Sequence, residues 1–164
     1  MGVTLAQRQI RLVYGAGNIG LMGVLADAVL ENGGEVLGVI PDFLKEKEVC
    51  HTGLTELVVT QTMHQRKQIM EERSDGVIVL PGGFGTLDEF FEILTWKQLH
   101  LHNKPVGLLN VGGFYDPLLA HFQKMQAEGF IKPANFDLVV VAENMDDLLK
   151  KMEQATVEAV DKWL

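Results

Sequence analysis

The sequence predicts an α/β fold, a three-layer sandwich in which helices cover both faces of a mostly parallel β-sheet. Short apolar runs rich in β-branched residues alternate along the chain with segments of helical length. Several of these runs are apolar throughout, which is typical of parallel strands buried on both faces. The chain has 164 residues, of which 47% are hydrophobic and 22% are charged. That size and composition suit a globular protein, so we expect residues 1–164 to form a single domain.

The first half of the chain contains three predicted strands and two predicted helices. A strand is expected at 10–14 and is followed, after a glycine-rich turn, by a helix at 20–31. The apolar run at 36–40 predicts the next strand, and the segment 41–55 is interpreted as a surface loop. A third strand at 57–60 precedes a helix at 62–73. Cys50 and His51, in the loop, are interpreted as incidental surface residues rather than a catalytic pair, because the sequence suggests no Asp or Asn partner for them.

The second half continues the alternation with three strands and three helices. The run GVIVL predicts a strand at 76–80, which leads into a helix at 86–100. A strand at 105–109 is followed by a helix at 117–128, where Asp116 is expected to be the N-cap and Pro117 the first helical residue. A last strand is expected at 138–141. The amphipathic segment 145–163 is interpreted as a packing helix.

Charge and cysteine content restrict the partners and the compartment. A formal net charge of -8 disfavours a nucleic acid or an anionic membrane as the main partner, so an anionic ligand needs a local binding device. A single cysteine, with no signal-peptide pattern and no long apolar stretch, predicts a cytoplasmic protein without membrane contact. His100 and His102 are interpreted as loop residues rather than metal ligands, because no third ligand is evident. No metal site is expected.

The first cluster of candidate functional residues is the segment YGAGNIGLMG. Gly15, Gly17 and Gly20 follow a predicted strand and open a helix with the spacing G-x-G-x-x-G. Such a turn lets backbone amides approach a phosphate closely, as in dinucleotide-binding proteins. An NAD site is the less favoured interpretation, because Asp42 is only a loose candidate for the acidic residue that should follow the next strand. The sequence leaves open whether the turn lines a ligand or simply needs a positive φ.

The second cluster is PGGFGTLDE, which follows a predicted strand and leads into a helix. Three glycines in four positions leave a loop with few side chains, so its amides can form an anion-binding nest at the positive end of the helix. We therefore expect the loop to hold a phosphate monoester without help from Lys or Arg. The loop residues concerned are Gly82, Gly83, Phe84, Gly85 and Thr86. It is not a Walker A loop, because no Gly-Lys-Ser/Thr sequence ends it.

Two glutamates follow on the same predicted helix. Glu89 and Thr86 have the spacing of a capping box, in which each side chain satisfies an amide at the helix start. Against this, the helix is apolar around most of its circumference, and a carboxylate on a buried helix is costly unless it is paired or faces a site. We therefore interpret Glu89 as functional, whereas the role of Glu92 stays open.

The third cluster is MHQRK, in the helix predicted at 62–73. Arg66 shares an apolar stripe with Met63, so its guanidinium is expected to meet an anion. That anion is either a ligand or an acidic partner within the chain. His64 and Lys67 lie on a flank that is more easily solvated or turned toward another subunit.

Together, YGAGNIGLMG, MHQRK and PGGFGTLDE, followed by WKQLHLHNKPVGLLNVGGFYDPLL, resemble the Lonely Guy family of cytokinin-activating phosphoribohydrolases, which also carries the older label of lysine decarboxylase. The similarity runs from about residue 11 to at least residue 131. Members hydrolyse the N-glycosidic bond of a nucleoside 5′-monophosphate, such as AMP or a cytokinin riboside monophosphate, to the free base and ribose 5-phosphate. The resemblance therefore implies a Rossmann-like sandwich and this hydrolase activity, with no metal or organic cofactor.

The resemblance also implies roles for particular residues. The family's catalytic arginine falls on Arg66 and its catalytic glutamate on Glu89, and a carboxylate beside the broken bond can stabilise an oxocarbenium-like transition state. A homodimer or higher homo-oligomer is expected, because members commonly associate through the helix at 86–100. The residues expected to bind the nucleotide substrate and its phosphate are Gly15, Gly17, Met63, Lys67, Gly82, Gly83, Phe84, Gly85, Thr86 and Glu92.

The sequence departs from the family pattern at two points. Members usually begin with a further strand and helix carrying a Cys-Gly-Ser-Ser-like turn, whereas here about ten residues precede Arg11. Ala16 stands where the family usually has glycine. The first departure favours a rival function, a non-catalytic carrier of a nucleotide or of the molybdenum cofactor, but the presence of Arg66 and Glu89 favours the enzyme. A lysine decarboxylase would need a lysine to bind pyridoxal phosphate, and neither glycine-rich motif contains one.

Overall fold

The computed structural model describes residues 1–45 and 50–155 of the chain. The chain divides into two compact units, Met1–Ser74 and Asp75–Leu164. Each unit is an α/β assembly around three parallel strands. The predicted α/β class and the parallel pairing are therefore confirmed, and the strands of the described residues form two three-stranded sheets. A single domain over 1–164 stays a prediction.

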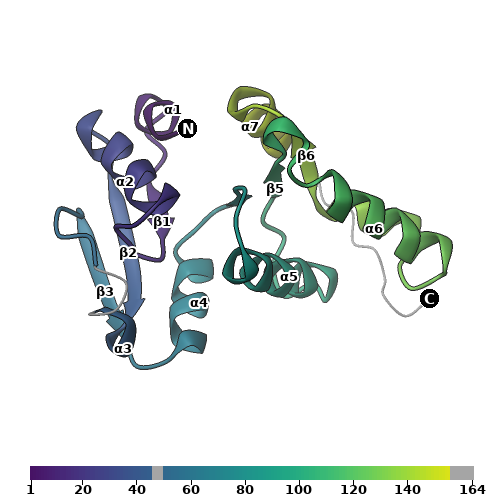
Figure 1. The fold of residues 1–164 in the computed structure, drawn as a ribbon, viewed down its shortest axis with the longest axis horizontal. Helices are drawn as coiled ribbons and strands as arrows, with labels where there is room; N and C mark the ends of the chain where they lie inside the picture. The colour runs from purple at the N-terminus through teal and green to yellow at the C-terminus, as the bar shows by residue number, and fades with distance from the viewer. Residues whose placement is uncertain (46–49, 156–164) are drawn as a thin grey trace. The chain divides into compact units, whose positions relative to one another are not determined.

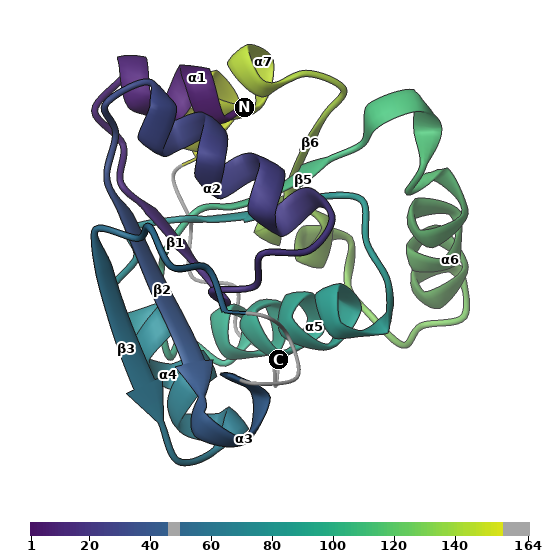
Figure 2. The same cartoon turned by 60° about the vertical axis from the view of Figure 1, so that its left-hand side comes forward.

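The first unit is built around the sheet β1-β2-β3 (Figure 1). Figure 2 shows α1 and α2 on one side of this sheet and α4 on the other. The central strand β2 is buried along its whole length, as its apolar sequence requires. The elements are α1 (Gly2–Gln7), β1 (Leu12–Tyr14), α2 (Leu21–Glu31), β2 (Val36–Pro41), α3 (Asp42–Lys45), β3 (Glu56–Thr60) and α4 (Met63–Glu72).

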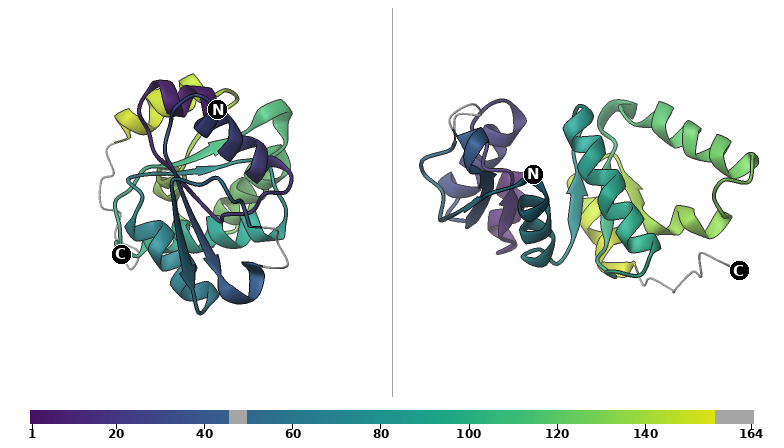
Figure 3. Two further views of the ribbon diagram at one scale, coloured as in Figure 1. Left: turned by 90° about the vertical axis from the view of Figure 1, so that its left-hand side faces the viewer. Right: turned by 90° about the horizontal axis from the view of Figure 1, so that it is seen from below.

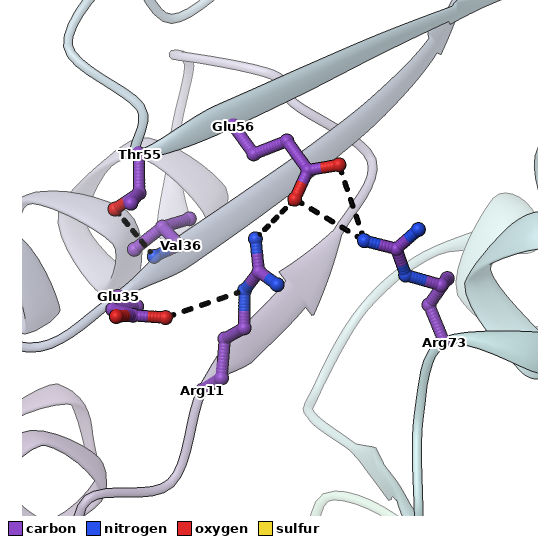
Figure 4. A network of polar contacts seen from close by, with 6 residues as sticks. All are labelled: Arg11, Glu35, Val36, Thr55, Glu56 and Arg73. Atoms are coloured by element: carbon purple, nitrogen blue, oxygen red, sulfur yellow. Dashed lines mark hydrogen bonds and ion pairs between the residues drawn. The ribbon is translucent and has the colours of Figure 1, made fainter.

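Polar contacts join the beginnings of the strands in this unit (Figure 4). Arg11, just before β1, donates from Nη2 to Oε2 of Glu56 in β3 over 2.6 Å, and Arg73 donates to Oε1 of the same carboxylate over 3.1 Å. The amide of Val36 donates to Thr55 Oγ1 over 3.0 Å. The hydrogen bond from Arg11 is the main reason that the pKa of Glu56 lies below its ordinary value, and the charge of Arg73 lowers it further.

The second unit is built around the sheet β4-β5-β6, whose elements can be followed in the two views of Figure 3. The elements are β4 (Val77–Val79), α5 (Phe84–Gln98), β5 (Val106–Leu109), η1 (Val111–Gly113), α6 (Asp116–Ala127), η2 (Pro133–Leu138), β6 (Val140–Ala142) and α7 (Met145–Gln154). One face of the sheet, with Val106 and Leu108, packs against α5 and α6. The other face meets α7 so closely that a Cβ on Gly107 would lie 2.6 Å from the sulfur of Met152.

Several predicted element bounds are wrong. Residues 2–7 form α1, which the sequence pattern did not indicate. Within the loop expected at 41–55, Pro41 instead ends β2 and 42–45 form α3. The helix expected from residue 86 already begins at Phe84, because Gly83 takes the N-cap position. The strand expected from residue 138 begins at Val140, because 133–138 form the 3₁₀ helix η2.

The prediction that Asp116 is the N-cap of its helix is also wrong. Asp116 is the first residue of α6 and Tyr115 is the N-cap, while the carboxylate of Asp116 accepts a hydrogen bond of 2.7 Å from Asn110 Nδ2. The helix expected at 145–163 is described as far as Gln154, and the part of that prediction at 156–164 lies outside the described residues. Within the described ranges, no helix combines the length and apolar character that crossing a bilayer requires.

Candidate functional site

Arg66 lies on the buried side of α4 and packs against the glycine-rich turn of the same unit. Arg66 is only 7% exposed, and its Nη1 donates to the sulfur of Met63 over 3.7 Å. A Cβ on Gly15 would collide with Nη2 of the guanidinium, so the absence of a side chain at Gly15 makes the space that Arg66 occupies. The predicted proximity of Met63 and Arg66 on one side of the helix is confirmed, and Gly15, from the turn after β1, faces the guanidinium of Arg66. Lys67 is half-buried, whereas His64 is exposed.

The glycine-rich turn contains a backbone conformation that glycine adopts most easily. Gly20, the N-cap of α2, has φ 66°, which confirms that the motif needs a positive φ at this point. Ala16 also has a positive φ, 61°, which costs a residue with a side chain roughly 1–2 kcal/mol. Its methyl group is completely buried, and a Cβ on Gly38 of β2 would lie 2.7 Å from it. Ala16 is therefore strained and held in place by its surroundings.

The interpretation of His51 as an incidental surface residue is wrong. His51 is 8% exposed, and its Nε2 lies 2.8 Å from Oδ1 of Asp27 in α2. Nδ1 accepts a hydrogen bond of 3.0 Å from the amide of Gly53, so the ring carries its hydrogen on Nε2 and donates to Asp27. Cys50 is half-buried and forms an isolated antiparallel bridge with Gly17. Sequence reasoning missed Asp27, because no local pattern links residues 24 positions apart.

Tyr14, the last residue of β1, adds a buried hydroxyl to this cluster. Its Oη has no hydrogen-bond partner among the described residues. Burial raises the pKa of Tyr14 far above its ordinary value, and the charges of Cys50 and Asp27 raise it further. The phenol therefore stays protonated throughout the ordinary pH range.

The PGGFGT loop forms the start of α5 in the second unit. Gly83 is the N-cap without a side-chain hydrogen bond, and the amide of Leu87 donates to its carbonyl over 3.1 Å. The amides of residues 84–86 thus lie in the first turn, where a helix has no intrahelical acceptors for them. The capping-box interpretation of Thr86 is wrong, because Thr86 is the third residue of the helix and not its N-cap. A helix start of this kind favours an anion.

The three glycines of this loop have different surroundings. A Cβ on Gly82 would collide with the hydroxyl of Thr86, so this position excludes a side chain for steric reasons. A Cβ on Gly83 or on Gly85 would meet nothing within 4 Å. The loop is therefore open above these two glycines, as the predicted phosphate nest requires. Phe84, between them, is 93% exposed.

The loop is supported from beneath by Tyr115, a residue that sequence reasoning missed. Its hydroxyl donates a hydrogen bond of 2.5 Å to the carbonyl of Leu80, directly before the loop. The amide of Tyr115 donates in turn to Asn110 Oδ1 over 2.7 Å, and the amide of Asn110 donates to the carbonyl of Ala142 over 2.8 Å. Burial raises the pKa of Tyr115, so the hydroxyl keeps the hydrogen that it donates. The loop is thus fastened to β6.

The helix α5 carries charged residues at different depths. Glu89 and Glu92 are half-buried. Lys97 is 1% exposed, and its ammonium group donates to the carbonyl of Leu138 over 2.9 Å. Burial lowers the pKa of Lys97 below its ordinary value. Lys97 therefore joins the end of α5 to the end of η2 and is a structural contact.

The C-terminal end of α5 is closed by His102, which is buried. Its Nε2 lies 2.9 Å from the carbonyl of Ile93, and Nδ1 accepts a hydrogen bond of 3.2 Å from the amide of Lys104. Both ring nitrogens are thus used in fixing the connection after the helix. Over the described parts of the chain, no group of three His, Cys, Asp or Glu side chains is arranged to hold a metal ion.

An apolar hollow of about 130 Å³ lies on the second unit between α5, α6 and η2. Its walls include Phe91 and Leu94 of α5, Phe122 of α6 and Phe136 of η2. None of the predicted site residues lines it. Its surface is mainly apolar, so it does not suit the phosphate of a nucleotide.

Comparison with known proteins places these residues in a family context. The family model described as "Possible lysine decarboxylase" matches residues 22–152. A probable cytokinin riboside 5'-monophosphate phosphoribohydrolase of Oryza sativa subsp. japonica is 51% identical over 156 residues, covering 95% of this chain and 70% of that protein. A cytokinin riboside 5'-monophosphate phosphoribohydrolase of Rhodococcoides fascians is 51% identical over 147 residues, covering 89% of this chain and 74% of that protein.

Among solved structures, the molybdenum cofactor binding protein of Rippkaea orientalis is similar in fold. The TM-score is 0.67 at 22% sequence identity, over 93% of this chain and 82% of that one. At this identity the likeness concerns the fold alone, and it confirms the Rossmann-like arrangement of strands and helices.

Proposed function

This chain belongs to the Lonely Guy family, whose family model is described as possible lysine decarboxylase, and from that premise we propose that it is a nucleoside 5′-monophosphate phosphoribohydrolase. It hydrolyses the N-glycosidic bond of AMP or of a cytokinin riboside monophosphate and releases the free base and ribose 5-phosphate. The observation that carries the proposal is the 51% identity to relatives named as such hydrolases, over 95% of this chain.

The first step of the proposed mechanism is binding of the phosphate at the start of α5. The amides of residues 84–86 and the positive end of the helix supply the attraction, and the open space above Gly83 and Gly85 supplies the room. Thr86 adds its hydroxyl. Binding energy from the phosphate, which is remote from the broken bond, is used to position the sugar for reaction.

The second step is cleavage of the bond between ribose and base. Positive charge develops on the sugar ring in the transition state, and the carboxylate of Glu89 stabilises it and orients the attacking water. The buried guanidinium of Arg66 holds the ribose phosphate or assists the departing base. Gly15, Gly17, Met63, Lys67 and Glu92 complete the proposed substrate contacts.

The decarboxylase label of the family model describes a different chemistry, for which this chain is poorly suited. A lysine that forms an imine with pyridoxal phosphate must be reachable and able to lose its proton. Lys97 has a lowered pKa, but it is 1% exposed and bound to the carbonyl of Leu138. Neither glycine-rich motif contains a lysine. Neither Lys97 nor the two glycine-rich motifs therefore offer the lysine that a pyridoxal phosphate site needs.

The activity is tested by incubating the protein with AMP or with isopentenyladenosine monophosphate and separating the free base by chromatography. We expect base release by the wild type and a loss of at least about 100-fold in Glu89→Gln and in Arg66→Ala. Asp88→Asn and Gln68→Ala, exposed neighbours on the same helices, serve as matched controls and should stay active. Nucleotide binding without base release would indicate the rival function, a non-catalytic carrier.

The phosphate site is tested separately by Gly83→Ala. The added methyl group meets no protein atom within 4 Å and would enter the open space proposed for the phosphate, so the free energy of unfolding should fall only by the cost of alanine at an N-cap, less than about 1 kcal/mol. We expect KM for AMP to rise by about tenfold or more, as for the loss of one strong hydrogen bond. A Gly83→Ala variant with wild-type KM would place the phosphate elsewhere.

Assembly and location are part of the proposal. We propose that the chain forms a homodimer through α5 and acts in the cytoplasm, without nucleic acid or membrane partners. Large apolar side chains on and after α5 support the dimer, since Phe84, Phe91, Leu99 and Leu101 are all exposed. The single cysteine and the formal net charge of -8 support the location and the absence of anionic partners.

A further inference from the structure

The turn that contacts Arg66 is held in place by a segment more than 30 residues later in the chain. The amide of His51 donates to the carbonyl of Ala16 over 3.0 Å, and Cys50 pairs with Gly17 in an antiparallel bridge. Ala16 is the non-glycine residue with φ 61°, so these contacts act at the most strained point of the turn. The segment 50–53 therefore opposes relaxation of Ala16 to an ordinary conformation.

The side chain of His51 fastens that segment to α2. Its ring is bonded on both nitrogens, by donation from Nε2 to Asp27 over 2.8 Å and by acceptance at Nδ1 from Gly53 over 3.0 Å. These two contacts fix the tautomer and the orientation of the ring. The helix α2 begins directly after the turn. The contacts therefore form a closed circuit, which runs from Ala16 along the chain to Asp27 in α2, across to His51 and back to Ala16.

This circuit of contacts includes the turn against which the proposed catalytic Arg66 packs. Gly15 precedes the strained residue, and its backbone lies so close to the guanidinium of Arg66 that a Cβ would collide with Nη2. A shift of the turn by a few tenths of an ångström therefore changes the wall against which the guanidinium packs. Arg66 is 7% exposed, so the turn is part of what sets its position.

We infer that Asp27 and His51 are positioning residues, which keep the Gly15–Ala16–Gly17 turn in its strained form and thereby hold Arg66 in its reactive position. This inference rests on the proposed function, in which Arg66 is catalytic. Neither residue needs to touch the substrate. The pair works through backbone geometry, so its effect depends on the strain at Ala16.

Kinetics of base release from AMP test the inference. His51→Ala and Asp27→Ala should each lower kcat by roughly ten- to a hundredfold with a smaller change in KM, because a misplaced group costs rate more than binding. Asp27→Asn keeps an oxygen that accepts from Nε2 and should retain most of the activity. Thr52→Ala, an exposed neighbour in the same segment, is the matched control and should behave as wild type.

A suppressor distinguishes positioning from general stabilisation. Glycine adopts a positive φ without steric cost, so Ala16→Gly should keep the turn in place when the pair is lost. We expect the double variant Ala16→Gly, His51→Ala to recover most of the kcat lost in His51→Ala. If the double variant is as slow as His51→Ala, or if His51→Ala is as fast as wild type, the inference is wrong. Should His51→Ala fail to fold, Asp27→Ala with and without Ala16→Gly provides the same comparison.

Amide hydrogen exchange gives a readout that does not depend on activity. The amide of His51 is bonded to Ala16, so its exchange should accelerate by about tenfold or more in Asp27→Ala and stay slow in Asp27→Asn. If wild type releases no base but this pattern appears, the proposed function fails and the positioning contact stands. If wild type releases base and the His51 amide exchanges equally in both variants, the positioning role fails and the proposed function stands.

Discussion

At the scale of single residues, missing side chains determine the space around the proposed reactive groups. Gly15 leaves room for the guanidinium of Arg66, and Gly82 leaves room for the hydroxyl of Thr86. A Cβ on Gly83 or on Gly85 would instead point into open space. The glycines of these two motifs thus serve close packing within the protein and, in the proposed function, access for a phosphate.

The variant Gly15→Ala should change activity much more than stability. The new methyl group collides with the end of a flexible side chain, so the free energy of unfolding should change by less than about 1 kcal/mol, while kcat falls by roughly a hundredfold as Arg66 is displaced. Steady-state base release from AMP and urea unfolding measure the two effects. In an Arg66→Ala background the same substitution should cost no further activity. Additive losses would contradict the proposed contact.

At the scale of elements, α5 combines a start that is proposed to bind phosphate, the proposed catalytic residue Glu89 and the buried residue Lys97. Its end is joined to η2 by Lys97, which donates to the carbonyl of Leu138. Its start follows a loop that Tyr115, through the carbonyl of Leu80 and through Asn110, fastens to β6. Both contacts use polar groups inside an apolar cluster, where a hydrogen bond has one well-defined geometry.

The burial of Lys97 predicts a particular dependence of stability on pH. Because burial lowers its pKa, the folded protein loses this proton at a lower pH than the unfolded chain does. Stability should therefore rise with pH between the lowered pKa and the ordinary lysine value, and this rise should vanish in Lys97→Met. Lys97→Ala should cost about 2–5 kcal/mol through the cavity and the lost hydrogen bond. Urea unfolding across alkaline pH measures both variants, and an unchanged pH dependence in Lys97→Met would contradict the prediction.

At the scale of the whole molecule, both compact units contain residues with proposed roles. The first unit, Met1–Ser74, contains Arg66 and the strained turn, and the second, Asp75–Leu164, contains Glu89 and the loop proposed to bind phosphate. Each unit has its own apolar core and its own polar contacts. The stability of each unit therefore affects the proposed reaction.

The Arg11–Glu56–Arg73 network predicts an acid-sensitive contribution to the first unit. The hydrogen bond from Arg11 lowers the pKa of Glu56, so this contribution is fully present above the ordinary glutamate pKa and is lost as pH falls through the lowered value. Glu56→Gln should be less stable than wild type near neutral pH, and the difference should disappear in acid. Urea midpoints of both proteins at several pH values provide the measurement. A difference that persists in acid would mean that Glu56 stabilises the first unit through contacts that do not depend on its charge.

The proposed dimer is tested by mass and activity together. Light scattering at micromolar concentration should give about twice the mass of one chain. Leu101→Glu, at an exposed position directly after the helix proposed to form the interface, should lower the mass and the rate of base release together. A monomeric wild type would overturn the proposal. A monomeric Leu101→Glu variant with full activity would mean that each pocket is complete within one chain.

The sequence by itself determined the α/β class, the alternation of the strands with the longer helices and the residues of the three motifs. These features depend on the local alternation of apolar runs and on glycine spacing, which act over a few residues. The ends of elements were less well predicted, because caps such as Gly83 and Tyr115 carry no strong local signal. The capping-box alternative for Glu89 failed for the same reason.

Only the tertiary structure decided which residues distant in sequence are in contact and which parts of the chain each contact holds together. The contacts of His51 with Asp27 and of Tyr115 with Leu80 join residues 24 and 35 positions apart, and no local pattern announces them. The positive φ at Ala16 is equally invisible in sequence, because an alanine adopts it only when the surrounding contacts outweigh the strain. Local preferences choose the elements, whereas these polar and steric contacts arise only once the elements have packed.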